Sequence, residues 1–168
     1  MARNPPETVT EAAALRRSLS HFPTGVAVVT TCDDAGAPVG LTVSSFNSVS
    51  LSPPLILWSL SLTARSLADF RRHGAFAVNV LASDQGALCR RFAADISDRF
   101  AGIGWQPGHA GVPVLDGVAA VFECRLWARY PGGDHEIFLG EVIRHAHRDT
   151  PPLVYGRGQL AAFPEAGI

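Results

Sequence analysis

The feature that most constrains this chain is a pair of long apolar stretches near its C-terminus, joined by a turn with two glycines. The stretches cover 118–130 and 136–146, and Pro131-Gly132-Gly133-Asp134 lies between them. Glycine readily adopts the positive φ angles that tight turns between antiparallel strands require. The pattern therefore predicts a long β-hairpin and directs the rest of the chain towards an antiparallel sheet.

Shorter apolar stretches predict the other strands of such a sheet. Residues 26–32 are rich in β-branched side chains, 33–36 are typical of a turn, and 39–46 form the returning strand of a first hairpin. Pro53-Pro54 precedes a further apolar strand. Additional strands are expected at 55–60, 75–81 and 153–155.

Three helices are expected between these strands. A capping box at 8–11 and apolar residues at spacings of three or four (Ala12, Leu15, Leu19 and Phe22) predict an amphipathic helix from about Val9 to His21. Residues 66–73 are expected to be helical and to end at Gly74. Ser83-Asp84 can cap a third helix that ends near Phe92, and a long irregular connection follows over 102–113.

These elements predict a mainly β fold. Roughly six or seven strands, three helices and no regular alternation of the two favour an antiparallel barrel over a doubly wound parallel sheet. With 168 residues and 47% hydrophobic side chains, the chain can bury one sizeable core. We expect a flexible N-terminal segment at 1–10, a single domain at 11–163 and a C-terminal tail at 164–168.

Composition excludes several functional classes. The basic residues are 14 arginines and no lysine, which removes Schiff-base chemistry and the ordinary phosphate-loop lysine. The formal charge is −1 and no basic block is interleaved with aromatic residues, so no nucleic-acid partner is expected. The longest apolar stretch is far shorter than a membrane span, and the N-terminus lacks the apolar core of a secretory signal. Three widely separated cysteines, Cys32, Cys89 and Cys124, fit reduced thiols in a cytoplasmic protein.

Hydroxyl-bearing side chains interrupt the strand that returns at 39–46. Thr42 and Ser44 share one strand face, Ser45 follows, and a half-buried strand should not bring several hydroxyls to a core without partners. These groups could bind the heteroatom edge of a planar cofactor. A strand whose polar face simply meets solvent explains the pattern equally well.

A second candidate site lies at 61–66, where a helix is expected to begin. Free backbone N–H groups and the Arg65 guanidinium could together hold a phosphate there. Alternatively, Thr63 or Ser66 only caps the helix and Arg65 is solvated.

The histidines give one further candidate. His145 and His147 would share a strand face, but no nearby ligand pattern completes a metal site, and no metal is expected. His135 follows Asp134 at the bend of the long hairpin, where an imidazole can project over a pocket, although a lone turn histidine is often incidental. The sequence lacks a nucleophile elbow or an activated cysteine, whereas hydride transfer needs few catalytic side chains.

Several segments, in order, carry a family resemblance: 22–31, 40–46, 64–66, 76–81, 91–93 and the Gly133-Asp134-His135 motif. Together they resemble the short-chain flavin reductase family, the reductase partners of two-component flavin-dependent monooxygenases. The similarity extends from Leu15 to Gly158. It implies a split β-barrel of Greek-key type, a homodimer, and a flavin bound near the dimer interface.

The resemblance also implies roles for individual residues. The flavin, either FMN or FAD, would contact Thr42, Ser44, Ser45, Ser59, Thr63, Ala64, Arg65, Ser66, Asn79, Leu81, Ala82, Arg91 and Phe100, with Thr63, Arg65 and Ser66 on the phosphate. NADH or NADPH would contact Thr24, Asp134 and His135, and His135 is the candidate catalytic residue. Leu160 stands where family members often carry tyrosine, which leaves any contact of that ring in doubt.

The leading hypothesis is an NAD(P)H:flavin oxidoreductase that supplies reduced flavin to a separate monooxygenase. One alternative is a flavin-holding electron carrier that does not use nicotinamide, although Gly133-Asp134-His135 argues against it. Another is a ligand-binding or assembly protein that shares the fold without redox work.

Overall fold

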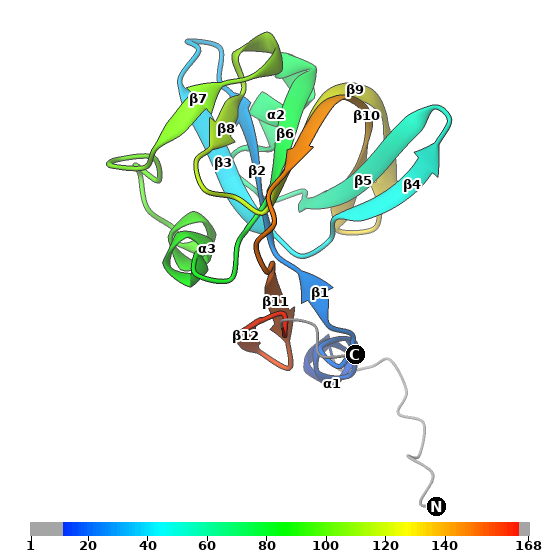
Figure 1. Cartoon of the computed structure of the whole chain (residues 1–168). Helices are drawn as coiled ribbons and strands as arrows, with labels where there is room; N and C mark the ends of the chain where they lie inside the picture. Colours follow the sequence, from blue (N-terminus) through cyan, green and yellow to red (C-terminus); the bar gives the residue numbers. More distant parts are fainter. Residues whose placement is uncertain (1–11, 165–168) are drawn as a thin grey trace, which may run out of the picture.

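A computed structural model describes residues 12–164 and shows a mainly β chain with short helices at its edges (Figure 1). Its strands and helices, in chain order, are α1 Ala12–Leu19, β1 Thr24–Gly25, β2 Ala27–Cys32, β3 Pro38–Val43, β4 Asn47–Leu51, β5 Pro54–Ser61, α2 Leu67–His73, β6 Ala75–Val80, α3 Gly86–Ala93, β7 Trp105–Pro107, β8 Pro113–Leu115, β9 Ala120–Gly132, β10 His135–His147, β11 Leu153–Gly156 and β12 Gln159–Ala162. A short 3₁₀ turn, His109–Gly111, separates β7 from β8.

Seven of the strands form one antiparallel sheet in the order β3-β2-β6-β9-β10-β5-β4. The β9–β10 hairpin is inserted between β5 and β6, which are consecutive strands, and this insertion gives the sheet its Greek-key order. The two edge strands, β3 and β4, are also consecutive, so the sheet must curl to bring its edges near each other. The predicted mainly β split barrel is confirmed.

The predicted long hairpin is present, but its turn is tighter than predicted. His135 pairs with Gly132, so only Gly133 and Asp134 form the loop, and Gly133 has a φ of 74°. A two-residue loop with glycine first suits the twist of antiparallel strands. The turn therefore places His135 at the first residue of β10.

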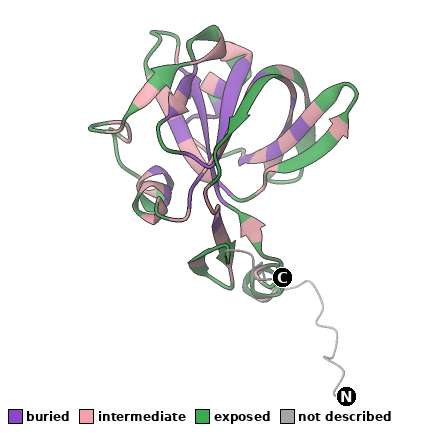
Figure 2. Cartoon of the chain, viewed as in Figure 1, coloured by how far each residue is buried: buried purple, intermediate pink, exposed green. Residues whose placement is uncertain are grey.

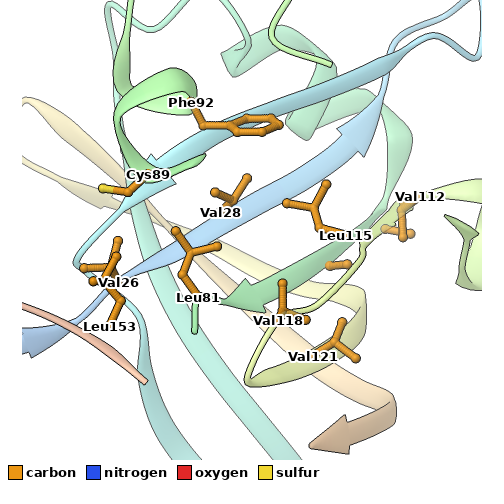
Figure 3. Close-up of a cluster of buried hydrophobic side chains, with 12 residues drawn as sticks. Val26, Val28, Leu81, Cys89, Phe92, Val112, Leu115, Val118, Val121 and Leu153 are labelled. Carbon is orange, nitrogen blue, oxygen red and sulfur yellow. The ribbon is translucent and has the colours of Figure 1, made fainter. Parts of the chain in front are cut away.

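Strand β2 is buried along its whole length because each of its faces meets a separate apolar cluster. Val26, just before the strand, and Val28 face α3 and Leu115, as Figure 3 shows. Val29, on the opposite face, packs in a cluster with Trp58, whose indole stacks on Phe138 at 4.7 Å between ring centroids. Strand β2 therefore lies between the two apolar clusters, and β3 pairs with it along its whole length.

A small projecting unit accompanies the barrel. Strands β1, β11 and β12 form a three-stranded sheet that lies with α1 below the barrel in Figure 1. None of the α1 residues is buried, and the unit is largely exposed in Figure 2. Phe22, which was predicted to extend the apolar face of this helix, is 77% exposed.

Several sequence predictions of elements need correction. Strands β1, β4 and β12 were not predicted, and the connection expected to be irregular contains β7 and β8. Helix α3 has Gln85 as its N-cap, so the predicted Ser83-Asp84 cap is wrong. Helix α2 ends at Gly74 in the left-handed conformation, as predicted. The capping box at 8–11 lies outside the described residues. None of the helices within residues 12–164 has the length and apolar run of a bilayer crossing.

Candidate functional site

A cavity of about 300 Å³ lies at the split in the barrel, and we call it the seam cavity. Its walls come from the end of β3, the end of β5 and the start of β10. The lining residues are Leu41, Thr42, Val43, Ser44, Ser45, Ser59, Leu60, Ser61, Ala64 and His135. Six residues that the sequence predicted for one site, Thr42, Ser44, Ser45, Ser59, Ala64 and His135, therefore meet here.

Strand pairing explains why a cavity forms at this place. Strand β4 pairs with β5 only from Pro54 to Leu57, so the backbone of β5 beyond Leu57 has no strand neighbour on that side. Ser45 replaces the missing neighbour, because its Oγ accepts a hydrogen bond from the Ser59 backbone N–H at 3.0 Å and donates one to the Ser59 carbonyl at 3.2 Å. A side chain holds the seam where a strand would otherwise fill it.

The hydroxyls of the seam cavity are used unequally. Thr42 Oγ1 donates to the Cys89 carbonyl at 2.7 Å, which fixes β3 against α3. The Ser44 and Ser59 hydroxyls have no hydrogen-bond partner among residues 12–164, and both residues line the cavity. These two hydroxyls are therefore the ones available to a ligand.

The turn between β5 and α2 carries the candidate phosphate residues. Ser61 Oγ and Thr63 Oγ1 are 2.9 Å apart, and the Thr63 backbone N–H donates to Ser61 Oγ. Ser66 is the N-cap of α2 but makes no side-chain capping bond, so the simple capping alternative does not describe it. Arg65 lines a neighbouring space, and its side chain is 84% exposed, as the alternative of a solvated arginine expects.

That neighbouring space, which we call the arginine cavity, has a volume of about 450 Å³. It lies beside the seam cavity: Gly40 and Thr42 share one face of β3 and line the arginine cavity and the seam cavity respectively. In the turn, Arg65 lines the arginine cavity and the preceding residue, Ala64, lines the seam cavity. The arginine cavity is lined by Asp33, Ala37, Pro38, Val39, Gly40, Arg65, Ser66, Asp69, Asp95, Ile96, Ser97, Asp98, Arg99 and Phe100.

Two arginines hold the loop after α3, which forms one wall of the arginine cavity. Arg91, predicted to approach the flavin, donates to the carbonyls of Asp98, Arg99 and Ala101. Arg99 donates to the carbonyls of Ala94 and Gly40, which ties the loop to β3. Arg91 does not line either cavity, whereas Phe100, also predicted, does. Sequence reasoning missed Arg99 because its partners are carbonyls, which leave no side-chain pattern.

His135 is oriented by its neighbour Asp134. Its Nδ1 lies 2.7 Å from Asp134 Oδ1, and the imidazole is 44% exposed at the seam cavity. The hydrogen bond from His135, together with the charge of the imidazole, lowers the pKa of Asp134. An ionised carboxylate only accepts hydrogen bonds, so Nδ1 carries the proton and Nε2 is left for a ligand. The Asp134 carbonyl also accepts the Leu62 backbone N–H at 2.9 Å, which binds the hairpin turn to the end of β5.

Four predicted site residues are placed away from both cavities. Asn79 is fully buried, donates to Val28 O and Thr30 Oγ1, and accepts the Leu115 N–H. Leu81 and Ala82 are buried in the core. Thr24 lies on β1, opposite Tyr155 of β11. The structure does not bring Thr24, Asn79, Leu81 or Ala82 together with the other candidates, and Thr63 lies on the turn between the two cavities without lining either.

Other reactive side chains do not add to the site. Residues 12–164 contain no group of three or more potential metal ligands. Burial raises the pKa of the Cys124 thiol to about 12, and it raises the pKa values of Cys32 and Cys89 as well. These thiols are suited to packing and not to nucleophilic chemistry.

Comparisons with known proteins show which proteins this chain resembles. The chain is 43% identical to the NADH-dependent FMN reductase SmoA of Agrobacterium fabrum over 150 residues, which cover 89% of this chain and 85% of SmoA. It is also 43% identical to HsaB, the reductase subunit of a flavin-dependent monooxygenase of Rhodococcus jostii, with 88% and 76% covered. An NADH:FAD oxidoreductase of Streptomyces globisporus, solved with NAD and FAD fragments, superposes with a TM-score of 0.90 at 36% identity, with 96% of this chain and 98% of that chain covered.

The match extends over most of the chain. Some relatives are longer: this chain spans 49% of the reductase component of a trigonelline monooxygenase from Acinetobacter baylyi, to which it is 39% identical. The family model of the flavin reductase like domain matches residues 19–164, which include both cavities and the Gly133-Asp134-His135 turn. The chain belongs to the flavin reductase-like domain family.

Proposed function

We propose that this protein is an NAD(P)H:flavin oxidoreductase, with the flavin ring in the seam cavity and the flavin phosphate at Arg65. The observation that carries the proposal is the meeting of free hydroxyls, an oriented imidazole and an arginine in two adjoining cavities. The relatives named as NADH-dependent reductases of FMN and FAD support the same chemistry.

The cavities fit a phosphorylated flavin in size and in chemistry. The partly buried apolar side chains of Leu41 and Ala64 can contact the faces of a flat ring, while the Ser44 and Ser59 hydroxyls can bond its polar edge or the ribityl chain. Thr63, Arg65 and Ser66 would hold the phosphate. Arg65 provides most of the attraction, because α2 is only seven residues long and its dipole is small.

The nicotinamide nucleotide is assigned to the open side of the seam cavity, at His135. When bound, the flavin accepts a hydride from the reduced nicotinamide. Asp134 holds the imidazole with Nε2 directed away from the carboxylate, so His135 can bind the nucleotide in one orientation. Orientation of this kind lowers the entropic barrier to hydride transfer and requires no proton transfer by the side chain.

The exposed apolar side chains support a homodimer. Phe22 and Leu19 on the projecting unit and Leu51 on β4 are strongly exposed, and they lie on elements at the margins of the barrel. A second copy of this chain would cover such side chains and could enclose a dinucleotide that one barrel leaves open. We expect light scattering to give a dimer mass at micromolar concentrations, and a strictly monomeric mass would contradict this assignment.

Reduced flavin is the product that would leave for a separate monooxygenase. Relatives named as reductase subunits of flavin-dependent monooxygenases support this partner. Three buried free cysteines fit a reducing compartment, and we assign the protein to the cytoplasm.

The central test measures oxidation of NADH and of NADPH by the purified protein with FMN, FAD or riboflavin. We expect at least one flavin to stimulate oxidation of one nicotinamide well above the free-solution rate. Flavin binding without any nicotinamide oxidation would instead support the electron-carrier alternative, and absence of flavin binding would contradict both.

Arg65→Ala tests the phosphate assignment. Loss of a charge-assisted hydrogen bond should cost about 1.5–3 kcal/mol in binding FMN and little in binding riboflavin, which has no phosphate. The dissociation constants of both flavins, measured by fluorescence titration, separate the two cases. Equal weakening of FMN and riboflavin would show that Arg65 acts through packing.

A further inference from the structure

The guanidinium proposed to bind phosphate already has an anionic partner. Arg65 Nη1 lies 2.9 Å from Asp95 Oδ1, and Arg65 Nη2 donates to Asp95 Oδ2 at 3.0 Å. The two contacts form the parallel pair by which arginine binds a planar carboxylate. The same two Nη groups would have to bind the phosphate, because they cannot make a full set of hydrogen bonds to the Asp95 carboxylate and to the phosphate at the same time.

Among residues 12–164, Arg65 is the only hydrogen-bonding partner of the Asp95 carboxylate. Asp95 follows directly on Ala94, whose N–H closes the end of α3 and whose carbonyl accepts both Nε and Nη2 of Arg99. These bonds fix the backbone beside Asp95 without involving its carboxylate. The Asp95 side chain makes no hydrogen bond within the described chain except the one from Arg65.

The ion pair is also weak enough to be displaced. The Arg65 and Asp95 side chains are 84% and 71% exposed, and ion pairs in such positions contribute little because water competes for both partners. A phosphate group that carries up to two charges can therefore take the guanidinium from the single charge of Asp95.

We propose that Asp95 is a specificity-determining competitor for the flavin phosphate at Arg65. In the ligand-free protein the carboxylate occupies the guanidinium, and in the complex its charge faces the phosphate across the arginine cavity. Both effects weaken the binding of phosphorylated flavins and leave riboflavin unaffected, which favours release of reduced FMN or FAD. The inference rests on the proposed function, since it requires Arg65 to bind the flavin phosphate.

Asp95→Asn tests the competition, because it removes the charge and keeps the size of the side chain. We expect the dissociation constant of FMN to fall about two- to tenfold, combining loss of an exposed ion pair with loss of a nearby like charge. The dissociation constant of riboflavin should change by less than about twofold. Fluorescence titration at low salt measures both values on the purified protein.

A matched control separates this effect from a general change in surface charge. Asp34 also forms an exposed ion pair, a single contact of 3.1 Å with Arg72 of α2, and the two side chains are 74% and 53% exposed, but Asp34 does not line the arginine cavity. Asp34→Asn should leave the affinities for FMN and riboflavin nearly unchanged. Equal tightening of FMN in Asp34→Asn and Asp95→Asn would overturn the proposal.

A double variant distinguishes failure of this inference from failure of the proposed phosphate site. In the Arg65→Ala background, Asp95→Asn should no longer give the full tightening of FMN, since the guanidinium for which the two anions compete is gone. Full tightening that persists without Arg65 would overturn the competition. If Asp95→Asn leaves FMN affinity unchanged but Arg65→Ala weakens FMN binding, the competition is overturned and the phosphate site is supported. If Arg65→Ala leaves FMN affinity unchanged, the phosphate assignment and this inference both fail.

Discussion

His135→Ala should separate nicotinamide binding from flavin binding. Because Asp134 holds Nδ1 at 2.7 Å, a ligand can bond only to Nε2, so the substitution removes one hydrogen bond from the nicotinamide nucleotide. Because the imidazole is 44% exposed, we expect its bond to the nucleotide to contribute no more than an ordinary hydrogen bond, a net of roughly 0.5–1.5 kcal/mol in binding free energy. The Michaelis constant for the nicotinamide should therefore rise about 2- to 13-fold.

Stopped-flow reduction of the flavin-loaded protein over a range of nicotinamide concentrations measures this effect. The dissociation constant of the flavin should change less than the Michaelis constant for the nicotinamide, since the flavin phosphate is assigned to the arginine cavity, which His135 does not line. His145→Ala is the matched control, because His145 lies further along the same strand and stacks on Phe122. Unchanged nicotinamide kinetics in His135→Ala, or loss of flavin with intact nicotinamide binding, would refute the assignment.

Three further predictions concern stability and reactivity. Gly140→Ala would place a Cβ near the ring of Phe76 and 3.0 Å from Cys124 Cβ, so the free energy of unfolding measured in urea should fall by about 1–3 kcal/mol. Gly25→Ala is the control: Gly25 has open space around it, so this substitution should leave the free energy of unfolding nearly unchanged. Burial raises the pKa of the Cys124 thiol from 9.0 to about 12, so the unfolded state loses the thiol proton at a lower pH than the folded state. The free energy of unfolding should therefore fall above pH 9 by about 1.4 kcal/mol per pH unit. A Cys124→Ala variant whose stability falls with the same slope would contradict this cause. The hydrogen bond and charge of His135 lower the pKa of Asp134, so its contribution to stability is present above pH 3.8 and is lost as the pH falls through the lower folded value. The difference in free energy of unfolding between wild type and Asp134→Asn should therefore shrink below pH 3.8, and a difference that stays constant there would count against this cause.

The sequence predicted the central strands because their patterns are local. Residues 26–32 are β-branched and lie between turn residues, and β2 forms there with both faces buried. Gly133 is required by the two-residue loop, so the long hairpin could also be predicted. Strand β4, in contrast, contains two serines and no continuous apolar face, and it is a strand only because β5 lies beside it.

The candidate site was predictable to the extent that its residues interrupt a pattern. Ser44 and Ser45 were noticed because hydroxyls are unexpected in an apolar strand, and both line the seam cavity. Asn79 was assigned to the site through the family resemblance, yet it donates to the Val28 carbonyl and to Thr30 Oγ1 and accepts the Leu115 N–H inside the core. Sequence cannot distinguish these two uses of a buried polar group. Asp95 and Arg99 had no sequence pattern, because the partner of Asp95 lies on the turn before α2 and Arg99 binds the backbone carbonyls of Ala94 and of Gly40 on β3.

The order of the strands explains why ring and phosphate recognition can vary separately in this fold. The two edges of the sheet are the consecutive strands β3 and β4, so the seam is held by few bonds, chiefly those between Ser45 and Ser59. The seam cavity is built on strands and is therefore fixed by the register of the sheet. The arginine cavity is closed by the loop after α3, whose exposed carboxylate can change without disturbing that register. Affinity for the phosphate can thus be adjusted on a loop while the ring and the imidazole keep their geometry.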